Sequence, residues 1–393
     1  MTRDLKIVSA AMLTWGFGEG MFYIFQPLYI QQFGADPILI GAILGINGFV
    51  MAASQIPSGI LADKIGRRPL MWFSWVSGVV ATWVMALAPS LGYFVVGMFL
   101  YGITSSVMAP LNTYIQDARG GWSVGRAVSF VSAFYNIGGV LGPIVGGLLG
   151  EVYDLRMVYY GSAVVFTIST AIVLFASKRE HNKESSHTTE DHFLRSRSFI
   201  GLMVVIFIVM MAVVLPQPLT ANFLQNQRGL SVARIGQLGA LGALGSVILM
   251  LVFGHLRSNI AMLIGQFGVL LFALLIWLGR GFIWYGAAFI FLGGFRLCRA
   301  MTVALARPLV RSFEVGFAFG VVESLNSLAF MVAPVIAGWL YDWQPEAIFP
   351  ISASVLGITM ILSFVIMQRN QHGSESEIVQ ADNFTVTEFV DED

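Results

Sequence analysis

Four ionisable residues lie deep inside long apolar stretches of this 393-residue chain, namely Glu19, Arg296, Arg299 and Glu323. A charge at the centre of a bilayer costs about 2.5–3.5 kcal/mol even on permissive scales, so such side chains face a cavity or a partner. Because an apolar environment disfavours the ionised form of a carboxyl group, Glu19 is the leading candidate for a proton carrier. A carboxyl group that hydrogen-bonds a neighbouring helix explains Glu19 equally well.

The two arginines are three residues apart, which places them on one face of a helix. Glu323 is expected at about the depth of Arg299, so a structural ion pair between them is the simplest account. Arg296 would then meet an anionic solute or Glu19. The further candidates for lining a solute cavity are polar side chains in the crossings: Tyr23, Gln26, Asn112, Gln116, Asn136, Gln217, Asn222, Gln225 and Asn326. For the amides among them, hydrogen bonding between helices is at least as good an explanation.

The stretches that carry these residues are membrane crossings by composition. Hydrophobic residues make up 56% of the chain, charged residues 11%, and the mean hydropathy is +0.77, whereas a soluble domain carries about 25% charged residues. A crossing needs about 20 apolar residues. We therefore expect an all-α membrane protein with twelve transmembrane helices: 6–31, 37–59, 70–88, 91–116, 126–150, 156–177, 198–225, 233–255, 260–279, 282–309, 316–341 and 347–368.

Polar segments divide these crossings into two sets of six. Residues 1–177 form the first predicted bundle, 178–197 a cytoplasmic central loop, 198–368 the second bundle, and 369–393 a disordered acidic tail. Sixteen of the 22 lysines and arginines fall on the side of the N-terminus and four on the other side. By the positive-inside rule, both termini are predicted to be cytoplasmic in a protein of the cell membrane.

The two bundles repeat short sequences at nearly one offset. Gln26-Pro27-Leu28 recurs as Gln217-Pro218-Leu219, and the run from Pro143 to Gly147 recurs as the run from Pro334 to Gly338. Ile40-Gly41 likewise recurs as Ile235-Gly236. Three such matches in the same order favour two pseudo-symmetric halves over chance. Parallel repeats of this kind place a solute site between the halves near the midplane.

The turn between the second and third crossings reads Gly-Ile-Leu-Ala-Asp-Lys-Ile-Gly-Arg-Arg-Pro-Leu over residues 59–70. It resembles the loop between helices 2 and 3 of the major facilitator superfamily, with the pattern G-x-L-a-D-[RK]-x-G-[RK]-[RK]. The resemblance implies a secondary transporter that works by alternating access, with helices 1, 4, 7 and 10 around a central cavity. A cytoplasmic anchor explains the basic residues but not the acid. The resemblance implies a conformational latch instead: Gly59, Asp63, Gly66, Arg67, Arg68, Asp117 and Arg126.

The fifth crossing carries a second motif, formed by Gly138, Gly142, Pro143, Gly146 and Gly147. It resembles the G-x-x-x-G-P-x-x-G-G signature of drug–proton antiporters in the same superfamily. Glycines at every fourth position share one helix face and allow another helix to approach closely, so plain packing is the alternative reading. The fourth crossing departs from the antiporter pattern because residues 94–116 contain no arginine.

We predict a transporter rather than an enzyme, because the chain holds no zinc-ligand, phosphate-loop or nucleophile motif, and its single cysteine, Cys298, excludes an internal disulfide. No metal, cofactor or nucleic acid is expected. The expected partners are the lipid bilayer, a small-molecule substrate and protons, and the protein is expected to be a monomer. Export of a small amphipathic compound driven by inward proton flow is the preferred function. The alternative is proton-coupled uptake of a small organic anion or sugar, with both arginines binding the charged group. A membrane sensor would need an added signalling domain.

Overall fold

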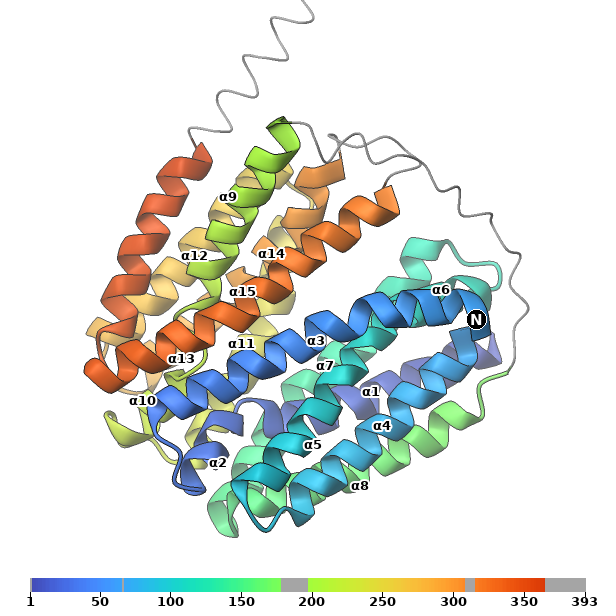
Figure 1. Cartoon of the computed structure of the whole chain (residues 1–393), viewed down its shortest axis with the longest axis horizontal. Helices are drawn as coiled ribbons and strands as arrows, with labels where there is room; N and C mark the ends of the chain where they lie inside the picture. The colour runs from blue at the N-terminus through green and yellow to red at the C-terminus, as the bar shows by residue number, and fades with distance from the viewer. Residues whose placement is uncertain (1, 66, 178–196, 308–314, 365–393) are drawn as a thin grey trace, which may run out of the picture.

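The computed structural model describes residues 2–65, 67–177, 197–307 and 315–364, without the side chains of 56–65, 67, 106, 108–110, 197–198 and 315–319. Every regular element in these ranges is a helix (Figure 1), which confirms the prediction of an all-α membrane protein. Eight of the described helices are long and apolar enough to cross a membrane, or nine if the bent pair α1 and α2 counts as one. The predicted tail at 369–393 lies outside the described residues, and so does the predicted loop at 178–197 except for Arg197, where α9 begins.

The first half contains α1 (Arg3–Tyr23), α2 (Gln26–Gln32), α3 (Pro37–Ile65), α4 (Arg67–Leu87), α5 (Leu91–Ile103), the 3₁₀ turn η1 (Thr104–Val107), α6 (Met108–Ala118), α7 (Val124–Val152) and α8 (Leu155–Leu174). The second half contains α9 (Arg197–Val214), α10 (Thr220–Asn226), α11 (Val232–Phe253), α12 (Ser258–Leu278), α13 (Phe282–Leu292), α14 (Gly294–Ala306), α15 (Val315–Trp343) and a last helix, Ile348–Phe364. These bounds follow the twelve apolar segments closely.

The first and seventh crossings are broken where the sequence predicted continuous helices. Proline lacks a backbone N–H and clashes with the carbonyl group four residues earlier. Pro27 therefore ends α1 at Tyr23, and α2 continues after a bend of 44°. Pro216 and Pro218 separate α9 from α10 in the same way. The break recurs in both halves because the Gln-Pro-Leu triplet is part of the repeat.

The two halves meet at one face of the bundle and diverge toward the other. In Figure 1 they converge at the end that carries α2 and α10, which we call the distal face, and separate toward the end that carries the N-terminus, the proximal face. One buried apolar cluster joins the first half to distal residues of the second, including Leu219 and Tyr285. A separate cluster, which includes Phe199 and Leu297, fills the proximal part of the second half. The structure is therefore closed at the distal face.

Two equivalent helix crossings hold the distal contact together. Helix α3 packs against α15, and α11 packs against α7. A β-carbon built on Gly338 would lie 3.2 Å from the Cα atom of Gly41, and one on Gly147 would lie 3.1 Å from the Cα atom of Gly236. Glycine is required at both crossings because the two backbones touch. The repeated Pro-to-Gly sequence thus gives α7 and α15 equivalent close contacts, α7 with α11 and α15 with α3.

Candidate functional site

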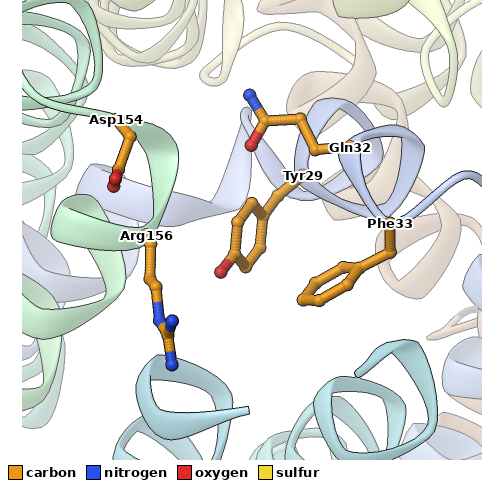
Figure 2. Close-up of a pocket in the computed structure, with 5 residues that line it drawn as sticks. All are labelled: Tyr29, Gln32, Phe33, Asp154 and Arg156. Atoms are coloured by element: carbon orange, nitrogen blue, oxygen red, sulfur yellow. The ribbon is translucent and has the colours of Figure 1, made fainter. Parts of the chain in front are cut away.

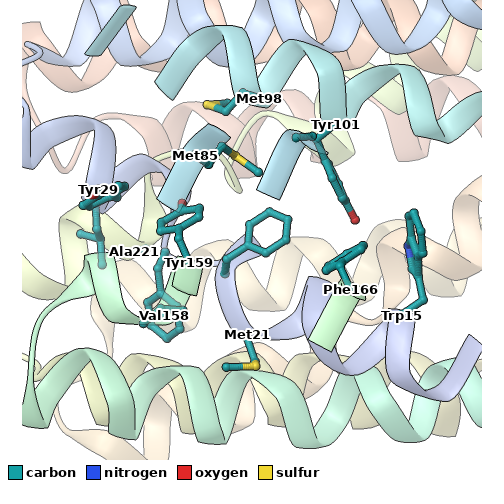
Figure 3. Packing of buried hydrophobic residues seen from close by; sticks show 14 of the residues in the cluster. Trp15, Met21, Tyr29, Met85, Met98, Tyr101, Val158, Tyr159, Phe166 and Ala221 are labelled. Carbon is teal, nitrogen blue, oxygen red and sulfur yellow. The ribbon is translucent and has the colours of Figure 1, made fainter. Parts of the chain in front are cut away.

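Glu19 lies near the C-terminal end of α1, close to the middle of the first crossing, and faces α7. The Tyr135 hydroxyl of α7 donates a hydrogen bond of 2.9 Å to Oε2 of Glu19. Tyr101 and Trp15 lie close to the same carboxyl group, and both rings belong to the aromatic core of the first half (Figure 3). The Glu19 side chain remains partly accessible. A carboxyl group placed in this way can bind a proton or a cationic group that enters from the gap between the halves.

Helix packing explains why these two residues meet. Gly138 and Gly142 of α7 contact the backbone of α1, since a β-carbon on Gly138 would lie 2.5 Å from the nitrogen of Phe17. Gly146 continues the same stripe along α1. Tyr135 comes three residues before Gly138 and so shares its face. The glycine motif of the fifth crossing therefore positions the proton-carrier candidate as well as packing two helices.

Arg296 of α14 approaches this group from the other half. One of its guanidinium nitrogens lies 3.5 Å from the amide oxygen of Asn136, the neighbour of Tyr135 on α7. Arg296 is exposed, and it interacts electrostatically with Glu19 and Tyr23. No ion pair joins Arg296 to Glu19 among the described residues. We call Glu19, Tyr23, Tyr135, Asn136 and Arg296 the central cluster, because it spans both halves.

Arg299, one turn along α14, is held differently. It forms an ion pair with Glu323 of α15, whose other carboxylate oxygen accepts a hydrogen bond of 3.1 Å from Asn326. Asn326 also lies 3.3 Å from the Thr302 hydroxyl. The Arg299 guanidinium group lies 5.8 Å from the ring centre of Phe330. This network satisfies both charges within the second half.

Tyr23 completes the central cluster at the end of α1. Its side chain is 49% exposed although it lies at the break between α1 and α2. The hydroxyl is within electrostatic reach of Glu19, Arg296 and Arg299. Tyr23 therefore lines the gap that separates the acid of the first half from the bases of the second.

Three of the predicted cavity amides lie at or near the distal side instead. Asn222 is 1% exposed and donates to the carbonyl of Pro27 at 3.2 Å and to Gln31. Gln26 is buried at the start of α2. Gln217 donates to the carbonyl of Val213 at 2.7 Å, which satisfies a backbone group freed by the proline break. Asn222 thus joins the two halves at the distal face, and Gln217 stabilises its own helix end.

Asn112 and Gln116 lie one turn apart on α6, in the proximal half of the fourth crossing. Both side chains are exposed. The remaining polar candidate of the seventh crossing, Gln225, lies on α10 and is partly buried.

The latch residues are described only in part. Gly66 lies outside the described residues, as do the side-chain surroundings of Gly59, Asp63 and Arg67. Arg68 stacks on Trp72, with 4.0 Å between the guanidinium carbon and the ring centre, and Arg126 stacks on Trp122 at 4.4 Å. Asp117 is located near the proximal end of α6. The latch therefore stays a prediction.

Two surface hollows lie at the distal face, away from the central cluster. Figure 2 shows the first, of about 210 Å³, lined by Tyr29, Gln32, Phe33, Asp154 and Arg156. Asp154 caps α8 by accepting from the nitrogen of Met157 at 2.9 Å, and Arg156 donates to the carbonyl of Ala86 at 3.1 Å. The second hollow lies beside Glu346, which pairs with Arg228 at 3.5 Å. The charged groups of both hollows thus serve local structure.

Three residues of the site were not predicted: Tyr135, Tyr101 and Trp15. The signal for Tyr135 was present in the sequence, because the spacing of Gly138 and Gly142 defines the face of α7 that meets α1. Trp15 comes four residues before Glu19 and so shares its face of α1. Tyr101 carries no such signal, since an aromatic residue in an apolar crossing normally faces lipid or packs in the core. Within the described ranges, no group of three or more His, Cys, Asp or Glu side chains is placed to hold a metal ion.

Comparison with known proteins shows which family model, relatives and solved structures this chain is similar to. A family model described as Major Facilitator Superfamily matches residues 8–298 and 202–388. The chain is similar to the class H tetracycline resistance protein of Pasteurella multocida, with 22% identity over 88% of this chain and 90% of that protein. It is 26% identical to the multidrug resistance protein MdtG of Citrobacter koseri over 48% of each. A solved structure of a nucleoside transporter NupG variant has the same fold, with a TM-score of 0.81 at 14% identity over 92% of this chain and 98% of that one.

Proposed function

The chain belongs to the Major Facilitator Superfamily, and from this premise we propose that it exports a small amphipathic compound in exchange for protons. Membership makes it a multi-pass membrane transporter rather than an enzyme. Relatives named for tetracycline resistance and multidrug resistance support the direction of transport proposed here. We further propose that it acts as a monomer in the cell membrane with both termini in the cytoplasm.

The position of Glu19 carries the proposal of proton exchange. It is a partly accessible carboxyl group in the middle of a crossing, hydrogen-bonded by Tyr135 and facing Arg296 across the gap between the halves. Closed distal contacts and separated proximal helices correspond to one end state of alternating access. If the proximal face is cytoplasmic, the central cluster in this state is open to the compartment from which the compound is collected.

The distal contacts must break for release on the other side. They consist of the two glycine crossings, of the buried apolar cluster that joins the halves, and of hydrogen bonds between the halves. In these bonds the Asn222 and Asn226 amides donate to Gln31, and the backbone nitrogen of Ala233 donates to Glu151 at 3.2 Å. Each hydrogen bond contributes about 0.5–1.5 kcal/mol net. Protonation of Glu19 from outside would then reset the cycle.

The test is compound-driven proton movement in proteoliposomes that contain a trapped pH indicator. Tetracycline and a panel of amphipathic drugs serve as trial compounds. We expect a transported compound to drive protons in the opposite direction in the native protein, and this exchange to be lost in Glu19→Gln. Asp342→Asn is the matched control, because it removes an exposed carboxylate at the distal end of α15.

The outcomes are distinct. A transported compound that moves no protons excludes proton exchange, and a Glu19→Gln protein that couples normally removes Glu19 from the role. Proton-coupled uptake of an organic anion is a second candidate, supported by the exposed guanidinium group of Arg296. In that case protons and the compound would move in the same direction across the same vesicles.

A further inference from the structure

We propose that the central cluster binds a zwitterion, whose anionic group contacts Arg296 and whose cationic group replaces the proton on Glu19. This inference rests on the proposed export function and names its substrate class. It goes beyond an amphipathic compound of unspecified charge, because it assigns one charged group of the substrate to each half of the protein.

The first support is the distribution of charge across the gap. Glu19 comes from α1 and Arg296 from α14, and each contacts a neutral side chain of α7 rather than the other. Tyr135 donates to Glu19 at 2.9 Å, while Asn136 lies 3.5 Å from Arg296. Within the described part of the chain, two opposite charges therefore face the same gap without forming an ion pair.

The second support is the contrast with the neighbouring pair. Arg299 and Glu323 bind each other, and Asn326 completes their network. These two charges cancel within the second half and need no ligand. Arg296 and Glu19 are the remaining charges of the four that lie deep in the crossings.

Charge balance then selects the ligand. A cation at Glu19 would leave Arg296 without an anionic partner once the gap closes. An anion at Arg296 would leave the Glu19 carboxylate without a cationic partner. A buried charge without a partner costs several kcal/mol. A ligand with one group of each sign satisfies both residues at once, so charge balance favours it over a ligand with a single charge.

One ring of the central cluster suits a ligand with an apolar body. Tyr23 is 49% exposed and lies within electrostatic reach of Glu19 and Arg296, and aromatic faces accept both apolar groups and cations. The rings of Trp15, Tyr101 and Phe166 pack on one another in the buried core of the first half, with 4.5 Å between the ring centres of Trp15 and Phe166 (Figure 3), so they hold α1 in place rather than contact the ligand.

Exchange for a proton follows from the same arrangement. The ammonium group of the ligand and the proton compete for one carboxylate, so Glu19 binds one or the other. The groups that face Glu19 from the packed elements are Tyr135 of α7, Tyr101 of α5 and Arg296 of α14. Since the zwitterion has no net charge, each exchange carries one positive charge inward and is electrogenic.

The probes are matched compounds that share one ring and differ in charge. L-Phenylalanine is the zwitterion, 3-phenylpropanoate the anion and phenethylamine the cation, with tryptophan, 3-indolepropanoate and tryptamine as a second set. Binding to the full-length purified protein in nanodiscs is measured by titration calorimetry. We expect the zwitterion of at least one set to bind at least tenfold more tightly than its anion and its cation.

Variants assign each half of the ligand. In Arg296→Gln the zwitterion should lose its advantage over the cation, and in Glu19→Gln its advantage over the anion. Arg280→Gln, at an exposed position of the α12–α13 turn, is the control that should bind as the native protein does. Equal or tighter binding of the anions or cations, or no binding preference for either zwitterion, overturns the proposal, as does an unchanged preference in Arg296→Gln.

Transport separates this inference from the export function on which it rests. If cations alone are exchanged for protons through Glu19, export stands and the zwitterion assignment is wrong. If zwitterions bind as expected but move no protons, the assignment of one charged group to each half stands, and the replacement of a proton on Glu19 is wrong together with the proposed proton exchange. An inward current during exchange supports both, and electroneutral exchange contradicts the predicted charge movement.

Discussion

Gly338→Val should open the distal face of the protein. A β-carbon at this position would lie 3.2 Å from the Cα atom of Gly41 and 3.3 Å from that of Ile38, so a branched side chain cannot fit while α15 and α3 are in contact. Overpacking of this kind costs about 1–3 kcal/mol. The cost falls only on the distal-closed state, because the helices separate when the face opens.

The magnitude follows from that difference. Since each 1.4 kcal/mol changes an equilibrium constant tenfold, the ratio of open to closed molecules should rise about 5- to 150-fold. Ala221 of α10 is a suitable reporter, because it is buried in the apolar cluster that joins the halves (Figure 3). In Ala221→Cys, a maleimide reaches the thiol only in the open state, and its labelling rate is proportional to the open fraction while that fraction is small.

The assay compares labelling rates of Ala221→Cys with and without Gly338→Val in purified, monodisperse protein. Gly357→Val is the control, because a β-carbon on this glycine of the last helix would meet nothing within 4 Å. The native Cys298 is buried and gives the background rate. An unchanged rate in the folded Gly338→Val protein, or an equal rise in Gly357→Val, would refute the reasoning.

Three further predictions concern other contacts. Gly147→Val should raise the same labelling rate to a similar degree, because it overpacks the equivalent crossing, and a change at one crossing only would contradict the pseudo-symmetry. Arg299→Gln or Glu323→Gln should each lower the free energy of unfolding by about 1–3 kcal/mol in denaturant titrations. Exchanging the two residues should recover part of that loss. Single changes that leave the free energy of unfolding unaltered would exclude the pair. Ser169→Ala should lower the free energy of unfolding by about 1–3 kcal/mol, because the buried indole N–H of Trp75 loses the acceptor that lies 3.1 Å away. Thr167→Ala removes an exposed acceptor 3.2 Å from the indole nitrogen of Trp83 and should cost less than about 1 kcal/mol in the same denaturant titrations.

The sequence predicted the crossings well because lipid imposes one simple requirement on them. Every backbone group in the apolar layer must be satisfied within a helix, so apolar length marks each segment to within a few residues. The helix breaks at Pro27 and Pro216 were not predicted, because average hydropathy carries no information on single backbone hydrogen bonds. Both prolines were visible in the sequence, but a proline alone does not mark a helix end, because Pro143 and Pro334 lie inside the continuous helices α7 and α15.

The candidate site was predictable in its charges and less so in its neutral groups. Glu19 and Arg296 stand out because a charge in an apolar crossing is costly anywhere except at a cavity or a partner. Asn222 has no such signal, since an amide is equally suited to a cavity and to a contact between helices. Its place at the distal face depends on the bend after α1, which brings Pro27 and Gln31 to α10.

The acid and the base of the central cluster are contributed by different repeats, Glu19 by α1 and Arg296 by α14. Two identical six-helix polypeptides related by a two-fold axis would set acid against acid or base against base. A facing pair of opposite charges at this site, with one member from each half, is therefore available only when the two repeats differ. Either repeat produced alone and paired with itself should fail to rebuild this site, whereas co-expression of the two as separate polypeptides should restore it.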